Sequence, residues 1–227
     1  MRNPKILIGL VAAGLLTAGC GSDGSSSDSS GGGGAAQKAL PVAINGPQED
    51  VRKRGEDNLK VTPAPERDAP FIEQVQHRLR EVILLDAEVA GETSAKCPNG
   101  VTQKAGAVSQ CVVTYAGAEI PYEVKISDSY REGSSITSYN TTPKKGLLVG
   151  KVVYNALNER YGPESGSTDA SKLACEEIPA AKAVDFNSDT GYKCQYWGKH
   201  ANDGKGGYET RRVMIGPSGG IGFENVK

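Results

Sequence analysis

Two stretches of the chain carry apolar residues at the spacing of an amphipathic helix. The first follows Asp68, the expected N-cap, and has Pro70 in its first turn. Its apolar positions are Ile72, Val75, Leu79, Val82 and Ile83. The polar residues between them are expected to face solvent: Glu73, Gln76, Arg80 and Glu81. The second stripe comprises Val149, Val152, Val153, Ala156, Leu157 and Tyr161, and ends at Gly162 and Pro163, a common stop signal.

A constant offset relates the two stretches and predicts an internal repeat. Val75 lies 22 residues before Cys97, and Val153 lies 22 residues before Cys175. An offset of 78 therefore carries four positions of the first stretch onto four of the second, namely Val75, Leu79, Ile83 and Cys97 onto Val153, Leu157, Tyr161 and Cys175. A loop and a strand-like run with a second cysteine, Cys111 or Cys194, follow in each case.

Period-two alternation after each helix predicts antiparallel strands. The clearest run is 120–126, where the apolar positions are Ile120, Tyr122, Val124 and Ile126. In the second half the runs 208–215 and 220–226 are joined by the turn signal 216–220. The sequence does not decide which face of 208–215 is buried, because Val213 and Ile215 point one way while Tyr208 and Met214 point the other.

These patterns predict an α+β fold of two tandem units. Each unit would be one helix packed on a small antiparallel sheet of three or four strands and closed by one disulfide. The expected boundaries are 68–143 for the first unit and 144–227 for the second.

The N-terminus carries an export signal. Arg2 and Lys5 precede an apolar run over 6–16, which is too short to span a membrane. The following residues, Leu16-Thr17-Ala18-Gly19-Cys20, resemble the bacterial lipoprotein signal. That resemblance implies removal of residues 1–19, acylation of Cys20, and attachment to the lipid bilayer on the outer face of the cytoplasmic membrane of a bacterium.

Residues 20–67 are expected to form a disordered tether. The tract 21–36 is almost entirely Gly, Ser and Asp, and prolines interrupt the polar stretch that follows it. As one flexible coil, residues 21–67 would reach roughly 35 to 40 Å.

Composition narrows the class of protein. The 227 residues include 26 Lys and Arg against 27 Asp and Glu, a net charge of −1, and no basic block. A nucleic-acid partner is therefore not expected. With Gly counted and Tyr left out, the apolar share is about 46%, as in ordinary globular domains.

Four cysteines remain once Cys20 is acylated, an even number in an oxidising compartment. Four cysteines allow three pairings, and the repeat favours Cys97 with Cys111 and Cys175 with Cys194. The chain has no Cys-x-x-Cys, so neither a redox motif nor a zinc ribbon is indicated.

A helix, then Cys97-Pro-Asn-Gly100, then Gly106-Ala-Val-Ser-Gln-Cys111 and a strand resemble a domain of unknown function that is common in actinobacterial secreted proteins and lipoproteins. The resemblance covers residues 71–140; it is weaker over 149–227, where Glu-Glu follows Cys175 and the cysteines stand five residues further apart. It implies the fold and an envelope location, and it implies no activity.

The sequence contains no recognisable catalytic, nucleotide-binding or metal-binding motif, and we predict no cofactor and no metal. The expected role is binding an envelope protein or a cell-wall ligand, with a secreted-type protein inhibitor and, less favoured, a hydrolase as alternatives. His77 is expected on the flank of the first helix. The candidate partner-binding residues cluster near the only Trp: Tyr196, Trp197, His200, Asn202 and Arg211.

Overall fold

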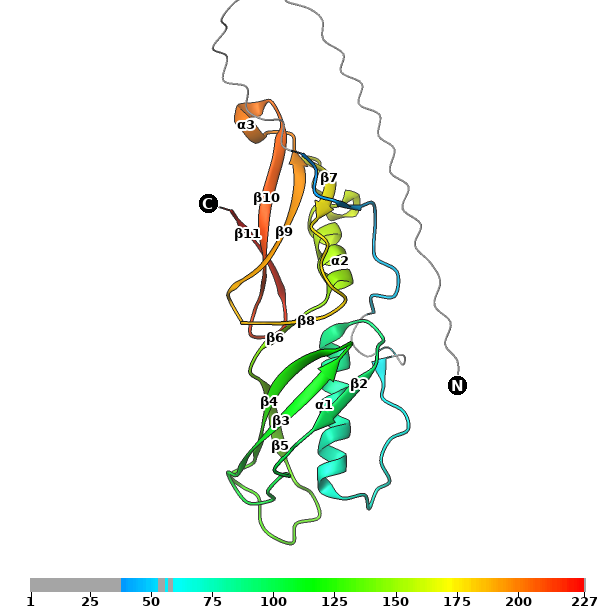
Figure 1. Ribbon diagram of the computed structural model, residues 1–227, viewed down its shortest axis with the longest axis vertical. Coiled ribbons are helices and arrows are strands. Elements are labelled where there is room, and N and C mark those ends of the chain that lie inside the picture. The colour runs from blue at the N-terminus through cyan, green and yellow to red at the C-terminus, as the bar shows by residue number, and fades with distance from the viewer. Residues whose placement is uncertain (1–37, 53–55, 57–58, 227) are drawn as a thin grey trace, which may run out of the picture. The chain divides into compact units, whose positions relative to one another are not determined.

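The computed structural model describes residues 38–52, 56 and 59–226. These residues form an α+β fold in which helices lie beside antiparallel sheets (Figure 1). The two longer helices are α1 (Phe71–Ala87) and α2 (Gly150–Tyr161). The predicted fold class is thereby confirmed as α+β with antiparallel sheets. The signal segment, Cys20 and the tract 21–36 lie outside the described residues.

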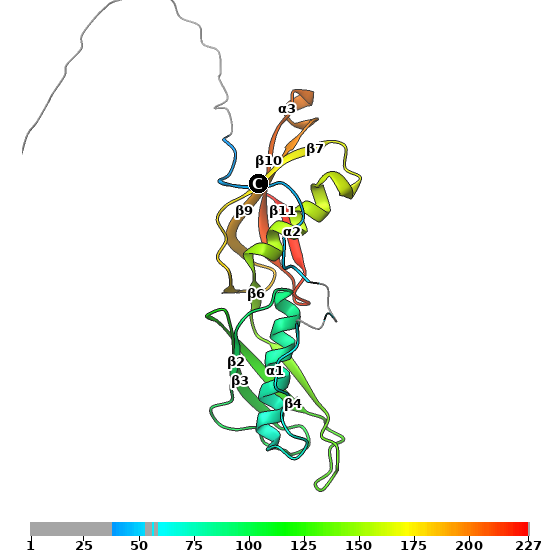
Figure 2. The same cartoon turned by 90° about the vertical axis from the view of Figure 1, so that its right-hand side faces the viewer.

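Helix α1 accompanies a sheet with the strand order β2-β3-β4-β5, and Figure 2 shows it running over one face of that sheet. The strands are β2 (Thr93–Lys96), β3 (Val108–Tyr115), β4 (Ala118–Ile126) and β5 (Tyr139–Pro143). The alternating residues of β4 are at most 1% exposed: Ile120, Tyr122, Val124 and Ile126. The first three share a core with Val75, Leu79 and Ile83 of α1, so this helix stripe and this strand face pack as their periodicities predicted.

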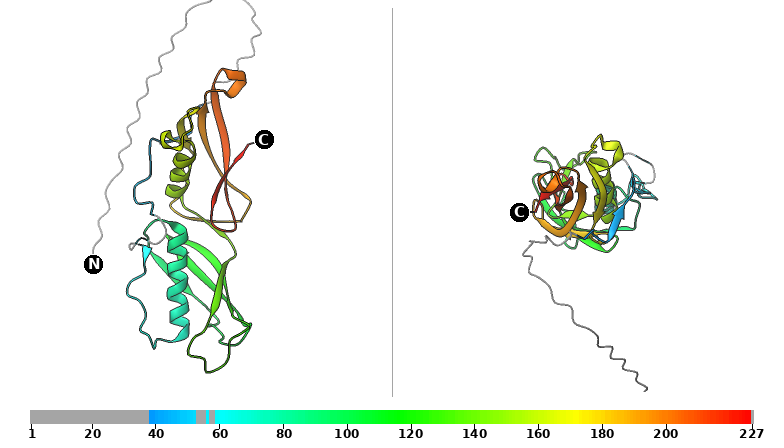
Figure 3. Two further views of the ribbon diagram at one scale, coloured as in Figure 1. Left: turned by 180° about the vertical axis from the view of Figure 1, so that it is seen from behind. Right: turned by 90° about the horizontal axis from the view of Figure 1, so that it is seen from above.

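Helix α2 accompanies a sheet with the order β1-β7-β9-β10-β11, seen from behind in Figure 3. The strands are β1 (Val42–Ile44), β7 (Ala170–Cys175), β9 (Asp189–Gly198), β10 (Gly207–Ile215) and β11 (Ile221–Asn225). The open question about β10 is resolved, because Val213 and Ile215 are buried in one core with Leu157 of α2.

Four shorter elements are also present in the described chain. A two-stranded sheet joins β6 (Gly146–Leu148) to β8 (Lys182–Val184). A 3-10 turn, η2 (Pro163–Ser165), follows α2, and the short helix α3 (Ala201–Gly204) lies at the tip of the β9–β10 hairpin (Figure 1).

Both disulfides join neighbouring strands or strand ends. Cys97, directly after β2, is bonded to Cys111 of β3, and Cys175 of β7 is bonded to Cys194 of β9. This is the pairing that the repeat spacing favoured. All four cysteines are buried, so each bond also contributes to a hydrophobic core.

The expectation of a disordered tether up to residue 67 is wrong for its second half. Strand β1 pairs antiparallel with β7, and Ile44 is only 5% exposed. Further along, Leu59 and Val61 are buried in the core beneath α1, and Val51 forms an isolated bridge with Val89. These few apolar residues are enough to hold an otherwise polar segment, because each buries its side chain against an existing core.

Two smaller expectations also need correction. Helix α1 begins at Phe71 after Pro70, with no side-chain cap, so Asp68 is not its N-cap. Leu59 and Val61 share a core with α1, so the part of the chain packed around this helix begins before the expected boundary at residue 68. A backbone bond from Glu73 N to Pro70 O serves the first turn instead.

Candidate binding groove

The residues predicted from sequence divide between the two faces of the β9–β10 hairpin and its tip. Tyr196 and Arg211 lie on the face toward α2, joined by Glu209. The Tyr196 hydroxyl donates to Glu209 Oε2 at 2.9 Å, and Arg211 Nη2 donates to that hydroxyl and to Glu209 Oε2, each at 2.7 Å. Cross-strand pairing places Glu209 opposite Tyr196. The sequence did not reveal this partner, because its periodicity did not decide which face of β10 is buried.

This cluster is packed against α2. The Tyr196 ring stacks on Tyr161 at 4.3 Å, and the Tyr196 residue is 8% exposed. Burial raises the pKa of the Tyr196 phenol above its ordinary value. Burial opposes the charge of Arg211, but its hydrogen bond to Tyr196 and the nearby Glu209 outweigh that and raise its pKa. The cluster therefore holds a neutral phenol between two charged groups and ties the hairpin to the helix.

Trp197 lies on the opposite face of β9. Its ring meets Tyr208 edge to face at 5.2 Å, and Lys172 Nζ lies 4.8 Å from the ring centroid. The indole also packs on Gly206, where an added Cβ would lie 3.1 Å from the ring and where φ is +76°. Trp197 is thus half-buried by its own neighbours, and its role in binding stays a prediction.

His200 and Asn202 belong to the hairpin tip. The His200 side chain is 76% exposed, with Nε2 3.5 Å from Asp169 Oδ1. Asn202 adopts a left-handed conformation (φ 52°) and its amide donates to Gly206 O at 3.2 Å. The five candidates do not form one site, because successive strand residues point to opposite faces.

A groove between α1 and β2 was missed by the sequence analysis. It has a volume of about 490 Å³, and its walls are α1, the strand β2 and the segment 63–65. The lining residues are Pro63, Ala64, Pro65, Glu73, Gln76, His77, Arg80, Thr93, Ser94 and Ala95. A second groove of about 370 Å³, lined in part by Lys60, Glu92 and Gly91, shares Arg80 and Thr93 with the first. The two grooves therefore meet at Arg80.

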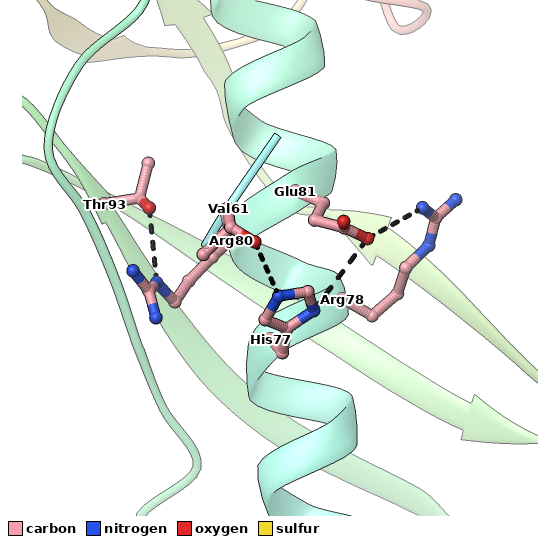
Figure 4. Close-up of polar contacts among 6 residues, drawn as sticks. All are labelled: Val61, His77, Arg78, Arg80, Glu81 and Thr93. Carbon is pink, nitrogen blue, oxygen red and sulfur yellow. Dashed lines mark hydrogen bonds and ion pairs between the residues drawn. The ribbon is translucent and has the colours of Figure 1, made fainter. Parts of the chain in front are cut away.

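Arg80 is the central cation of these grooves. Its Nε donates to Thr93 Oγ1 at 3.3 Å (Figure 4). Among the described residues it forms no ion pair, although it is half-buried. The terminal guanidinium nitrogens remain able to donate a forked pair of hydrogen bonds to a carboxylate.

His77 anchors the adjoining segment. Its Nε2 lies 3.0 Å from Val61 O, and Nδ1 lies 4.0 Å from Glu81 Oε2, which Arg78 also approaches at 3.4 Å (Figure 4). A carbonyl only accepts, so Nε2 carries the proton that it donates to Val61. Of the polar residues expected to face solvent, Glu73 is exposed, whereas Gln76, Arg80 and Glu81 are only partly exposed. The sequence signal for this adjoining segment is the apolar pair Leu59 and Val61 within a polar stretch.

The chain matches no known protein-family model, and neither a curated protein nor a solved structure is significantly similar to it. Within the described ranges, no helix is long and apolar enough to cross a membrane. The same residues contain no group of three or more His, Cys, Asp or Glu side chains placed to hold a metal ion.

Proposed function

We propose that this protein is anchored by acylated Cys20 to the outer face of the cytoplasmic membrane of a bacterium, and that it acts by binding another protein of the envelope. The anchor is supported by the charged N-terminus, the short apolar run and the small residues before Cys20. Two disulfides in the folded part suit an oxidising compartment.

We also propose that the folded part is a tandem of two copies of one unit. The supporting observation is that the two halves repeat one order of elements: a helix, a strand that ends at or next to the first cysteine, a disulfide to the next long strand, and a hairpin. The helices even repeat one contact pattern. His77 meets Glu81 and the backbone of Val61, and Asn155, at the position given by the offset of 78, meets Glu159 and the backbone of Gln48.

The observation that carries a binding role is the half-buried, ion-pair-free Arg80 at the junction of two grooves. Holding a half-buried cation without an anionic partner is unfavourable. A ligand carboxylate would supply that partner. An arginine that can pair with a ligand carboxylate favours a binding role over a catalytic one.

The anchor is tested by Cys20→Ala in the native cell, with Ser22→Ala as the matched control. Cys20→Ala should leave an uncleaved or mislocalised precursor, whereas Ser22→Ala should be processed and retained normally. Normal membrane retention of Cys20→Ala would contradict the anchor.

The binding role is tested by placing a photo-crosslinking residue at Ser94, beside the groove, or at His200, at the hairpin tip, in intact cells. A specific adduct that forms at one position and is absent at the other supports a defined binding surface. The Ser94 position reports on the groove and His200 on the surface near Trp197. Absence of a specific adduct at both positions would contradict the role.

A further inference from the structure

Strand β7 shows how one edge of this fold accepts an added strand. The short strand β1 pairs antiparallel with it, with Val42 opposite Cys175 and Ile44 opposite Leu173. Ile44 and Leu173 are both buried in the core beneath α2. A three-residue segment from far along the chain thus completes the edge through backbone pairing and one buried apolar side chain.

Strand β2 holds the corresponding place in the other half. Both β2 and β7 follow the long helix and pair with the strand that carries the second cysteine. The offset of 78 carries Leu173 and Cys175 onto Ala95 and Cys97. Yet among the described residues β2 pairs with β3 alone, and its other edge borders the groove beside α1.

The groove also differs in charge from its counterpart. The offset places Asn158, which is 7% exposed, where α1 has Arg80. Beside the edge of β7, which β1 covers, the helix therefore has a neutral buried amide. Beside the open edge of β2, the helix has a cation without an ion pair. Glu73 lines the first groove and Glu92 the second, whereas Arg80 and Thr93 line both.

We propose that the open edge of β2 accepts an extended segment of a partner protein as an added antiparallel strand, with an acidic side chain that pairs with Arg80. This proposal rests on the binding role proposed above. Main-chain hydrogen bonds would supply the affinity, and alternate side chains the specificity, as in other cases of strand addition.

The register of β1 specifies the sequence pattern of that segment. Directly opposed residues of an antiparallel pair share a face of the sheet. The residue opposite Ala95 would take the place of Ile44 and should be apolar. Two residues later the segment would lie opposite Thr93, whose hydroxyl already contacts Arg80, and should be acidic. The expected pattern is apolar, any residue, Asp or Glu.

The test uses the full chain in detergent and the synthetic peptide acetyl-Thr-Val-Thr-Ile-Thr-Asp-Thr-amide, with binding measured by calorimetry. Arg80→Met should weaken binding about tenfold, because a charge-assisted contact is lost. Arg78→Met is the matched control, since Arg78 is a more exposed cation of the same helix that pairs with Glu81, and it should change nothing. Replacing the peptide Asp by Asn should weaken binding to the wild type by the same factor. The same replacement should not weaken binding to the Arg80→Met variant any further.

Backbone pairing is tested separately by methylating alternate peptide nitrogens and by amide hydrogen exchange. Methylation on the pairing side should abolish binding, and the bound peptide should slow exchange of β2 amides. Strand addition would be overturned if the methylated peptides still bind, if Arg80→Met leaves the affinity unchanged, or if exchange of the β2 amides is unchanged by the peptide. It would also be overturned if the peptide does not bind, or if the edge of β2 is already protected from exchange in the free chain. A crosslinked partner in cells whose footprint lies away from Ser94 would overturn strand addition while leaving the binding role standing.

Discussion

The edges of β2 and β7 carry the main difference between the two halves of the described chain. Both strands lie beside a long helix and next to a disulfide, but β7 is covered by β1 and β2 borders a groove. Uncovered strand edges are ready templates for pairing, and proteins usually cover or disguise them. The same set of elements can therefore be closed into a structural sheet or left open for a partner.

The segments that run beside the two helices sharpen this contrast. Beside α2, Gln48 N donates to Asn155 Oδ1 at 3.0 Å, after the chain has already paired with β7. Beside α1, Val61 O accepts from His77, yet the segment 63–65 only lines the groove. Contact with the helix flank is thus common to both halves, whereas completion of the sheet edge is seen in one.

The largest expected effect is loss of a disulfide. Replacing Cys97 and Cys111 by Ala, or Cys175 and Cys194 by Ala, should each lower the free energy of unfolding by about 3 kcal/mol, since the closed loops are similar in length. Chemical denaturation of each double variant measures this. Markedly unequal losses would argue against equivalence of the two halves.

Next in size is the strand that closes β7. Ile44→Ala should cost about 2 kcal/mol, because a buried branched side chain is truncated. It should also speed hydrogen exchange along β7. Ile136→Ala is the control, since Ile136 is 77% exposed and should change stability by less than about 0.5 kcal/mol. Equal behaviour of the two variants would mean that β1 contributes little to the sheet.

The paired helix contacts should have smaller and matching effects. His77→Ala removes the bond to Val61 O and Asn155→Ala removes the bond to Gln48 N, each at a cost of about 1 kcal/mol. Thermal unfolding of both variants measures the comparison. A loss confined to one of them would show that the two flanking segments are not held in the same way.

The smallest expected effect on stability is that of Arg80→Met. The aliphatic stem is retained and only the hydrogen bond to Thr93 is lost, so the change should stay within about 0.5 kcal/mol. Denaturant unfolding measures this. A loss of several kcal/mol would assign Arg80 a structural role and weaken the contrast between an open and a closed edge.

The sequence by itself determined the features that depend on local periodicity and covalent spacing. The apolar stripes of α1 and α2 and the alternation in β4 are all readable within short windows. The repeated spacing favoured both disulfides, Cys97 with Cys111 and Cys175 with Cys194. The apolar periodicity is visible in the sequence because each of these elements buries one face in a core.

Only the tertiary structure decided which distant segments meet. Val42–Ile44 is too short to show a period, and its partner β7 lies far along the chain, so the closing strand resembled part of a tether. Leu59 and Val61 likewise join the core beside α1 from outside the helix, which no local period could show. Trp197 and Arg211 were grouped because they are near in sequence and share one hairpin, but strand alternation sends their side chains to opposite faces. Long-range pairing follows from the total area that the whole fold can bury, and no short window of sequence contains that quantity.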